Sequence, residues 1–174
     1  MTLLSRTEIE GALSRLGELA QARGKPVELL VVGGAAMVLG FDARQSTHDI
    51  DAIILEPLPA AEIRLIVAQV ATELGWPEDW INDGAKGFMR GQQRGLLLFE
   101  SVGIRVYLPP VEQLLAMKLS AWRDDVDIND ASILLRVVRA SQSLEQVWSL
   151  LEPYLVPGRE LKARFAFDEL WENS

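Results

Sequence analysis

The stretch that decides the fold is Val31–Leu55, VVGGAAMVLGFDARQSTHDIDAIIL, in which a glycine pair and two carboxylates stand between apolar runs. The first run leads into Gly33 and Gly34, and the second opens with Asp49 and Asp51 as Asp-x-Asp. Side chains alternate between the two faces of a strand, so residues two apart point to the same side. We therefore expect both carboxylates to project together from one strand.

The carboxylate pair and the glycine pair together predict a site for a nucleoside triphosphate (NTP). Two adjacent carboxylates repel each other unless a cation lies between them, and hard oxygen ligands suit Mg²⁺, with Mn²⁺ as an alternative. Glycines leave room for a phosphate to approach backbone N–H groups at the start of a helix. We expect Asp49 and Asp51 to bind the metal and Gly33 and Gly34 to contact phosphate. A solvated strand edge and an ordinary tight turn are the structural alternatives.

Three blocks of sequence between positions 26 and 135 share their order with a known superfamily. They comprise Gly33, Gly34, Arg44, Thr47, Asp49 and Asp51, then Trp80-Ile81-Asn82-Asp83, and finally Leu114-Leu115-Ala116-Met117-Lys118-Leu119. In this order they resemble the nucleotidyltransferase superfamily to which DNA polymerase β belongs. Within it, the chain is similar to AbiEii-type toxins and to an uncharacterised bacterial nucleotidyltransferase-like family.

The expected fold class is α+β: a small mixed sheet of nucleotidyltransferase type flanked by helices, with a helical C-terminal third. We expect residues 1–110 to form the α/β core and residues 111–174 to form a helical part packed on it as one compact unit. Apolar periodicity and breaker residues predict strands over 27–32, 48–55, 96–100 and 104–108, and helices over 7–23, 35–39, 60–74, 110–122, 128–140, 143–154 and 158–171.

The resemblance implies Mg²⁺-dependent transfer of a nucleoside monophosphate from an NTP to an acceptor. A tRNA end or a protein hydroxyl is the acceptor expected of toxin-type relatives, with an antitoxin protein as partner; a small-molecule acceptor stays open. Polymerase-type members carry a third carboxylate on a neighbouring strand, and here the strands expected beside the pair offer only Glu100, near a turn. The alternative is therefore a catalytically inactive nucleotide-binding or protein-interaction module, although we favour an enzyme.

The resemblance also assigns residues outside the first block. In AbiEii-type proteins a lysine and a later aspartate of the helical part belong to the active site; Lys118 matches the lysine, and Asp127 and Asp130 compete for the aspartate. A solvated ion pair between helices is the structural alternative. Within the first block, Arg44 would contact the triphosphate or pair with Asp42, and Thr47 would orient a carboxylate or cap a turn.

Three further positions invite a chemical role. Trp80 and Asn82 could stack on and hydrogen-bond a base, or the tryptophan could simply pin a long loop to the core. His48 lies beside the carboxylates, but strand alternation directs it to the opposite face from Asp49, so we expect a packed or surface histidine.

Composition limits the remaining function classes. The net charge of −8 argues against a general salt-driven grip on nucleic acid, and the absence of cysteine excludes disulfides and thiolate zinc sites. The sequence has neither a run of about 18 apolar residues nor a secretory leader, so we expect a cytoplasmic protein without membrane contact. The glycine-rich segment 75–95 carries Lys86, Arg90 and Arg94, and predicts a mobile basic loop that contacts a polyanionic substrate or is a solvated surface.

Overall fold

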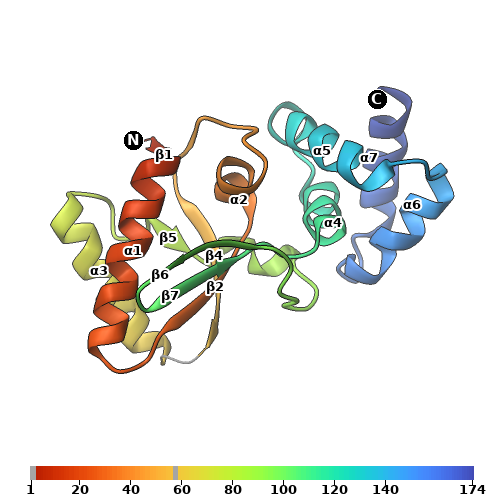
Figure 1. Cartoon of the computed structure of the whole chain (residues 1–174). Coiled ribbons are helices and arrows are strands. Elements are labelled where there is room, and N and C mark those ends of the chain that lie inside the picture. Colours follow the sequence, from red (N-terminus) through yellow and green to blue (C-terminus); the bar gives the residue numbers. More distant parts are fainter. Residues whose placement is uncertain (1–2, 57–58) are drawn as a thin grey trace. The chain divides into compact units, whose positions relative to one another are not determined.

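A computed structural model describes residues 3–56 and 59–174. The chain forms two compact units, each described here by itself. The α/β unit comprises the chain up to Gly84 together with Arg94–Leu108, and the helical unit comprises Ala85–Gln93 together with Pro109–Ser174. The helices and strands of the two units confirm the predicted α+β class (Figure 1).

A five-stranded mixed sheet forms the centre of the α/β unit, in the order β5-β4-β2-β7-β6. Its strands are β2 (Val27–Val31), β4 (Ile50–Glu56), β5 (Ile81–Asn82), β6 (Leu97–Ser101) and β7 (Ile104–Tyr107). Strand β2 runs antiparallel to β4 and parallel to β7, and β5 runs parallel to β4. Because β2 is the middle strand, four of its five residues are buried, which explains why it reads as an unbroken apolar run.

Three helices accompany this sheet: α1 (Arg6–Ala22), α2 (Gly33–Gly40) and α3 (Ala60–Leu74). Helix α1 packs against α3 and against β6 and β7. Its first residue has a further role, because the Arg6 guanidinium donates to the carbonyls of Val38 and Leu39 at 2.7 and 2.9 Å. A cation at the C-terminal end of a helix satisfies open carbonyls and complements the dipole, so Arg6 fixes that end of α2.

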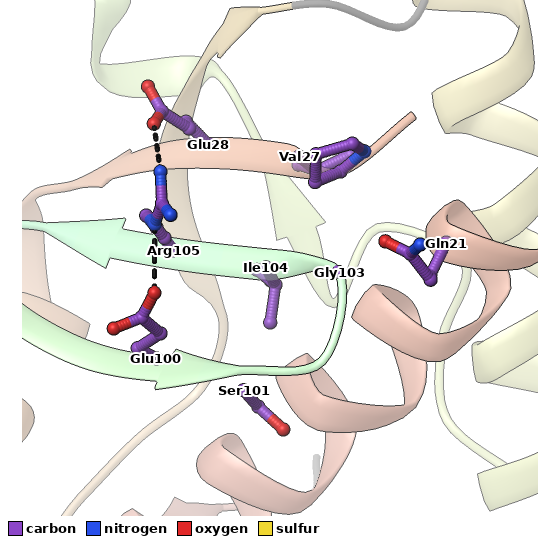
Figure 2. Close-up of a pocket in the computed structure, with 9 residues that line it drawn as sticks. Gln21, Val27, Glu28, Glu100, Ser101, Gly103, Ile104 and Arg105 are labelled. Carbon is purple, nitrogen blue, oxygen red and sulfur yellow. Dashed lines mark hydrogen bonds and ion pairs between the residues drawn. The ribbon is translucent and has the colours of Figure 1, made fainter. Parts of the chain in front are cut away.

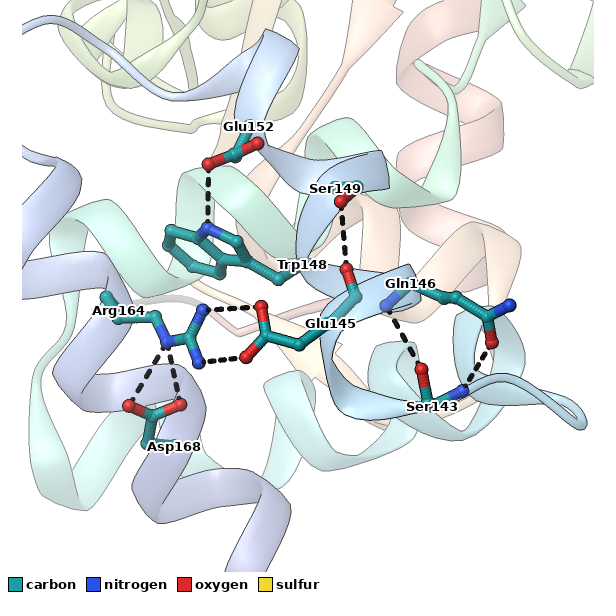
Figure 3. A network of polar contacts seen from close by, with 8 residues as sticks. All are labelled: Ser143, Glu145, Gln146, Trp148, Ser149, Glu152, Arg164 and Asp168. Atoms are coloured by element: carbon teal, nitrogen blue, oxygen red, sulfur yellow. Dashed lines mark hydrogen bonds and ion pairs between the residues drawn. The ribbon is translucent and has the colours of Figure 1, made fainter.

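The helical unit contains α4 (Val111–Ala121), α5 (Asp124–Arg139), α6 (Leu144–Leu151), the 3₁₀ helix η2 (Glu152–Tyr154) and α7 (Glu160–Glu172). Helix α4 contacts each of the others. Arg164 of α7 joins α6 by donating to Glu145 at 2.8 Å while its guanidinium lies 5.0 Å from the ring centre of Trp148 (Figure 3). None of the helices in residues 3–56 and 59–174 is both long and apolar enough to cross a bilayer.

The glycine-rich segment differs from the expected mobile loop. It contains β5 and a 3₁₀ helix, η1 (Gly84–Phe88), and its later part is fastened to the helical unit. The Gln113 amide donates to the carbonyls of Arg90 and Gly91 at 2.8 and 3.1 Å, and Tyr154 donates to Gln93 at 3.1 Å. These partners are far away in sequence, so the local glycine content predicts flexibility that tertiary contacts remove.

Two short strands lie outside the predicted strands. Strand β1 (Leu4–Ser5) pairs with β3 (Ser46–Thr47). Strand β4 begins at Ile50 rather than at His48, so Asp49 lies at its entrance instead of inside it. Helix α2 begins at Gly33, two residues before the predicted start, because the glycine pair forms its first turn.

The contact between α1 and the β6–β7 hairpin generates a stability prediction. A Cβ at Gly17 would overlap the carbonyl oxygen of Val102, whereas a Cβ at Gly11 of the same helix would meet nothing within 4 Å. We expect Gly11→Ala to raise the free energy of unfolding by about 0.5–1 kcal/mol through helix propensity, and Gly17→Ala to lower it. Urea unfolding of both variants checks this; equal effects at the two positions would contradict the close approach.

Candidate functional site

The turn between β2 and α2 is built for close approach. Gly33 has φ of +62°, a conformation that L side chains avoid, and a Cβ there would lie 2.6 Å from Oδ2 of Asp51. A Cβ at Gly34 would lie 2.5 Å from Oγ1 of Thr47. Val32 precedes the helix and has no polar side chain to cap it. The first turn of α2 therefore brings bare backbone next to a carboxylate.

The two predicted carboxylates are held at the entrance of β4, beside β5. Asp51 pairs with Asn82 in the register of the two parallel strands. Nδ2 of Asn82 donates to Oδ2 of Asp49 at 2.9 Å, and Oδ1 of Asn82 accepts from the Gly84 N–H at 2.8 Å. A Cβ at Gly84 would lie 3.6 Å from Oδ1 of Asp51, so both acids adjoin the same short segment.

The remaining residues of the first block lie on the same side of the turn. Thr47 is 7% exposed and its hydroxyl faces Gly34, and Nη1 of Arg44 lies 3.6 Å from a Cβ built at Gly34. Asp42, the acid considered for Arg44, lies 3.7 Å from the Arg6 guanidinium. The structure thus brings a cation, a hydroxyl and the Asp51 carboxylate around the glycine pair, while Asp49 is held by Asn82 of the neighbouring strand.

The carboxylates of Asp49 and Asp51 supply only part of the ligands that a divalent cation needs. Within the described residues no group of three or more His, Cys, Asp or Glu side chains is arranged to hold a metal ion. Mg²⁺ is commonly bound by one or two carboxylates, with substrate phosphates and water completing the coordination. Asp51 next to the Gly33 turn, with Asp49 joined to the same β4–β5 segment through Asn82, fits that pattern.

Sequence reasoning missed the contact that Asn82 makes and left the role of Trp80 open. Trp80 is 2% exposed and its indole N–H donates to the carbonyl of Val67 at 3.0 Å, so the tryptophan pins the segment to the core rather than offering a face to a base. Asn82 then contacts Asp49, a pairing that no sequence spacing indicates. His48 is exposed, which agrees with a surface histidine, but it precedes β4, so the strand alternation used to predict its direction does not apply.

The strand that follows the first acid, β4, lies between β5 and β2, and this changes the search for a third carboxylate. Glu100 lies in the edge strand β6, three strands from β4, and its carboxylate accepts from Arg105 at 2.8 Å. The residue opposite Asp51 on β5 is an amide, Asn82. On the β5 side, the position opposite Asp51 is therefore filled by a neutral amide.

A hollow of about 270 Å³ lies at the other end of the sheet and has no comparable chemistry. It surrounds the start of β2 and the β6–β7 turn, and Arg105 bridges Glu28 and Glu100 along its wall (Figure 2). Because these charges satisfy one another and Gly33 follows the opposite end of β2, we assign the hollow no functional role.

The helical unit buries the second set of predicted residues. Lys118 of α4 is 12% exposed, and its ammonium lies 2.8 Å from a carboxylate oxygen of both Asp127 and Asp130 on α5. Asp127 has no exposed side-chain area and also accepts from the backbone N–H and guanidinium of Arg123. The cluster is a buried network rather than the solvated pair considered as an alternative.

Opposing effects act on Asp127. Burial raises the pKa of its carboxyl, but hydrogen bonds from Arg123 and Lys118 outweigh burial and hold the pKa below its ordinary value. The group therefore stays ionised in the folded protein at a lower pH than in the unfolded chain.

Removing the lysine should expose the strength of this network. We expect Lys118→Met to lower the free energy of unfolding by about 3–5 kcal/mol, because two buried carboxylates then lose their shared cation. The matched control is Lys162→Met, which removes an exposed lysine of the same unit and should change stability by less than about 1 kcal/mol. Similar losses in the two variants would contradict a buried network.

The lowered pKa of Asp127 predicts a pH dependence with a definite sign. Its contribution to stability is complete above the unfolded-state pKa of about 3.9 and is lost as the pH falls through the lower folded-state value. We expect Asp127→Asn to reduce the fall in stability below pH of about 4, measured by urea unfolding at a series of pH values. An unchanged slope would mean that Asp127 does not contribute to acid unfolding.

Comparison with protein families adds an independent finding. Residues 11–156 match the family described as nucleotidyltransferase of unknown function (DUF6036). No curated protein and no solved structure matches the chain. The match spans most of the chain and includes the glycine pair, the two carboxylates and Lys118. The chain therefore belongs to this family of nucleotidyltransferases.

Proposed function

We propose that the protein transfers a nucleoside monophosphate from an NTP to a hydroxyl group of an RNA end or of a protein, with Mg²⁺ as cofactor. One observation carries this proposal: Oδ2 of Asp51 lies 2.6 Å from the position that a Cβ at Gly33 would occupy, so only glycine lets the helix start approach this carboxylate. Bare backbone at the start of a helix attracts phosphate, and the adjoining carboxylates suit a cation, so the triphosphate and its metal are expected at neighbouring positions.

Each residue of the turn has a part in this proposal. Gly33 and Gly34 let phosphate oxygens approach the first N–H groups of α2, and Arg44 adds positive charge near the same oxygens. Asp49 and Asp51 would hold Mg²⁺, which neutralises charge on the phosphates and assists departure of pyrophosphate when bound. Thr47, packed against Gly34, fixes the spacing between the turn and the strand that precedes the acids.

The transfer itself is a substitution at the α-phosphorus. The acceptor oxygen forms a bond to that phosphorus, the bond to the oxygen bridging the α- and β-phosphates breaks, and pyrophosphate leaves with the electron pair. The hydroxyl proton passes to solvent or to a basic side chain. Positioning and charge neutralisation supply most of the acceleration in such reactions. The roles of Lys118, Asp127 and Asp130 in the reaction stay predictions that rest on the resemblance to AbiEii-type proteins.

The same resemblance supports a toxin of a toxin–antitoxin pair as the biological setting, with a tRNA end or a protein hydroxyl as the acceptor. A second candidate function, a module that binds nucleotide without transferring it, is favoured by one observation. The residue opposite Asp51 on β5 is Asn82, which cannot take a proton from an acceptor as a carboxylate would.

A labelling experiment separates these functions. Wild-type protein is incubated with each α-³²P NTP, Mg²⁺ and a cell lysate, beside Asp49→Asn/Asp51→Asn. We expect label only with wild type, and a loss of labelling activity of about 100-fold or more in the variant. Changes to residues that merely hydrogen-bond to metal ligands already lower metal affinity or activity by about 10–100-fold. Sensitivity of the labelled product to ribonuclease or protease identifies the acceptor class.

The matched control is Asp79→Asn/Asp83→Asn, which removes two exposed carboxylates from the same unit and should label like wild type. Metal-dependent nucleotide binding without any label would favour the binding module. If the protein neither binds nucleotide nor transfers label, both proposals are refuted.

A further inference from the structure

The amide of Asn82 is held in a single orientation. Its NH₂ group can only donate and its carbonyl oxygen can only accept, and the structure uses one of each. Nδ2 donates to Asp49 at 2.9 Å, and Oδ1 accepts from the N–H of Gly84 at 2.8 Å. Exchanging the two groups would place a carbonyl oxygen against a carboxylate and an NH₂ group against an N–H. Both contacts therefore select the same orientation.

The segment that carries Asn82 is anchored on the core side. Trp80 is 2% exposed, its indole donates to Val67, and its carbonyl accepts from the N–H of Ile50 at 2.8 Å. The ring of Trp76 packs edge-on to it at 5.6 Å. A two-residue strand has little stability alone, so this buried tryptophan determines where Asn82 lies.

The carboxylate that accepts from Asn82 belongs to Asp49, one of two acids spaced two residues apart in the sequence. Asp49 lies outside the regular part of β4, so the strand alone does not fix its side chain. Asp51 lies inside the strand, opposite Asn82. Because Asn82 lies opposite Asp51 on β5, its charge-assisted hydrogen bond fixes the Asp49 carboxylate relative to the strand that carries Asp51, without adding a third charge.

We propose that Asn82 is a positioning residue, which orients the Asp49 carboxylate so that it can bind a divalent cation together with Asp51. This inference rests on the proposed metal-dependent function, but it concerns the protein's own ligand geometry and can be tested without turnover. Hydrogen-bond partners behind metal ligands fix the ligands' orientation, and their removal lowers metal affinity by about 10–100-fold.

The test measures Mn²⁺ binding by the free Mn²⁺ signal in electron paramagnetic resonance. We expect Asn82→Ala to bind Mn²⁺ about 10–100-fold more weakly than wild type, with a far-ultraviolet circular dichroism spectrum like that of wild type. Asp83→Asn, which changes the next and exposed residue, should bind like wild type. Equal Mn²⁺ affinity of Asn82→Ala and wild type would overturn the inference.

A second variant keeps the test independent of a folding defect. Asn82→Asp replaces the hydrogen-bond donor with a third acid. Without metal, the thermal midpoint of Asn82→Asp should therefore lie below that of Asn82→Ala. Added Mn²⁺ should raise the midpoint of Asn82→Asp by more than it raises the midpoint of wild type. A midpoint equal to that of wild type without metal would show that the side chain does not face Asp49, which also overturns the inference.

The outcomes separate the two proposals. If wild type binds Mn²⁺ and Asp49→Asn/Asp51→Asn does not, while Asn82→Ala binds like wild type, the metal site stands and the positioning role is wrong. If neither wild type nor the double variant binds Mn²⁺, even with an NTP present, the metal-dependent function is refuted and the positioning role with it.

Discussion

The α/β unit depends on the close approach of the β2–α2 turn to the strand that carries the acids. Cβ atoms at Gly33 and Gly34 would lie only 2.6 and 2.5 Å from side-chain oxygens of Asp51 and Thr47, so this approach requires glycine at both positions. The Val32 N–H donates to the Asp51 carbonyl at 2.9 Å, so backbone and side chain of the same residue hold the turn. With Arg6 binding the opposite end, α2 is fixed at both termini before any ligand arrives.

The parts of the fold that the sequence predicts correctly are those with a local signal. A window of about a dozen residues is enough to predict each of these elements: the buried run of β2, the glycine pair, the isoleucine-rich β4 and the amphipathic helices α1 and α3. The nucleotidyltransferase family follows from the same local pattern, since the glycines and the Asp-x-Asp keep their spacing. The substrate and metal do not follow from it, because the pattern fixes backbone and ligands but not their occupants.

The parts that were missed depend on partners distant in sequence. Strand β5 is two residues long and too short to show periodicity, and its Asn82 meets Asp49 across a long connection. The glycines after Gly84 indicate flexibility, but Gln113 supplies the hydrogen bonds that order them. Burial of Lys118 was equally invisible, since an apolar run followed by a lysine also describes an exposed helix end.

The path of the chain also constrains how such a protein can be divided. The backbone passes between the two units three times, after Gly84, after Gln93 and after Leu108. A truncation near residue 110 would release a C-terminal fragment that lacks Ala85–Gln93, the excursion that Gln113 and Tyr154 hold in place. Neither unit is a contiguous cassette, so recombination by a single crossover could neither transplant one nor delete it intact.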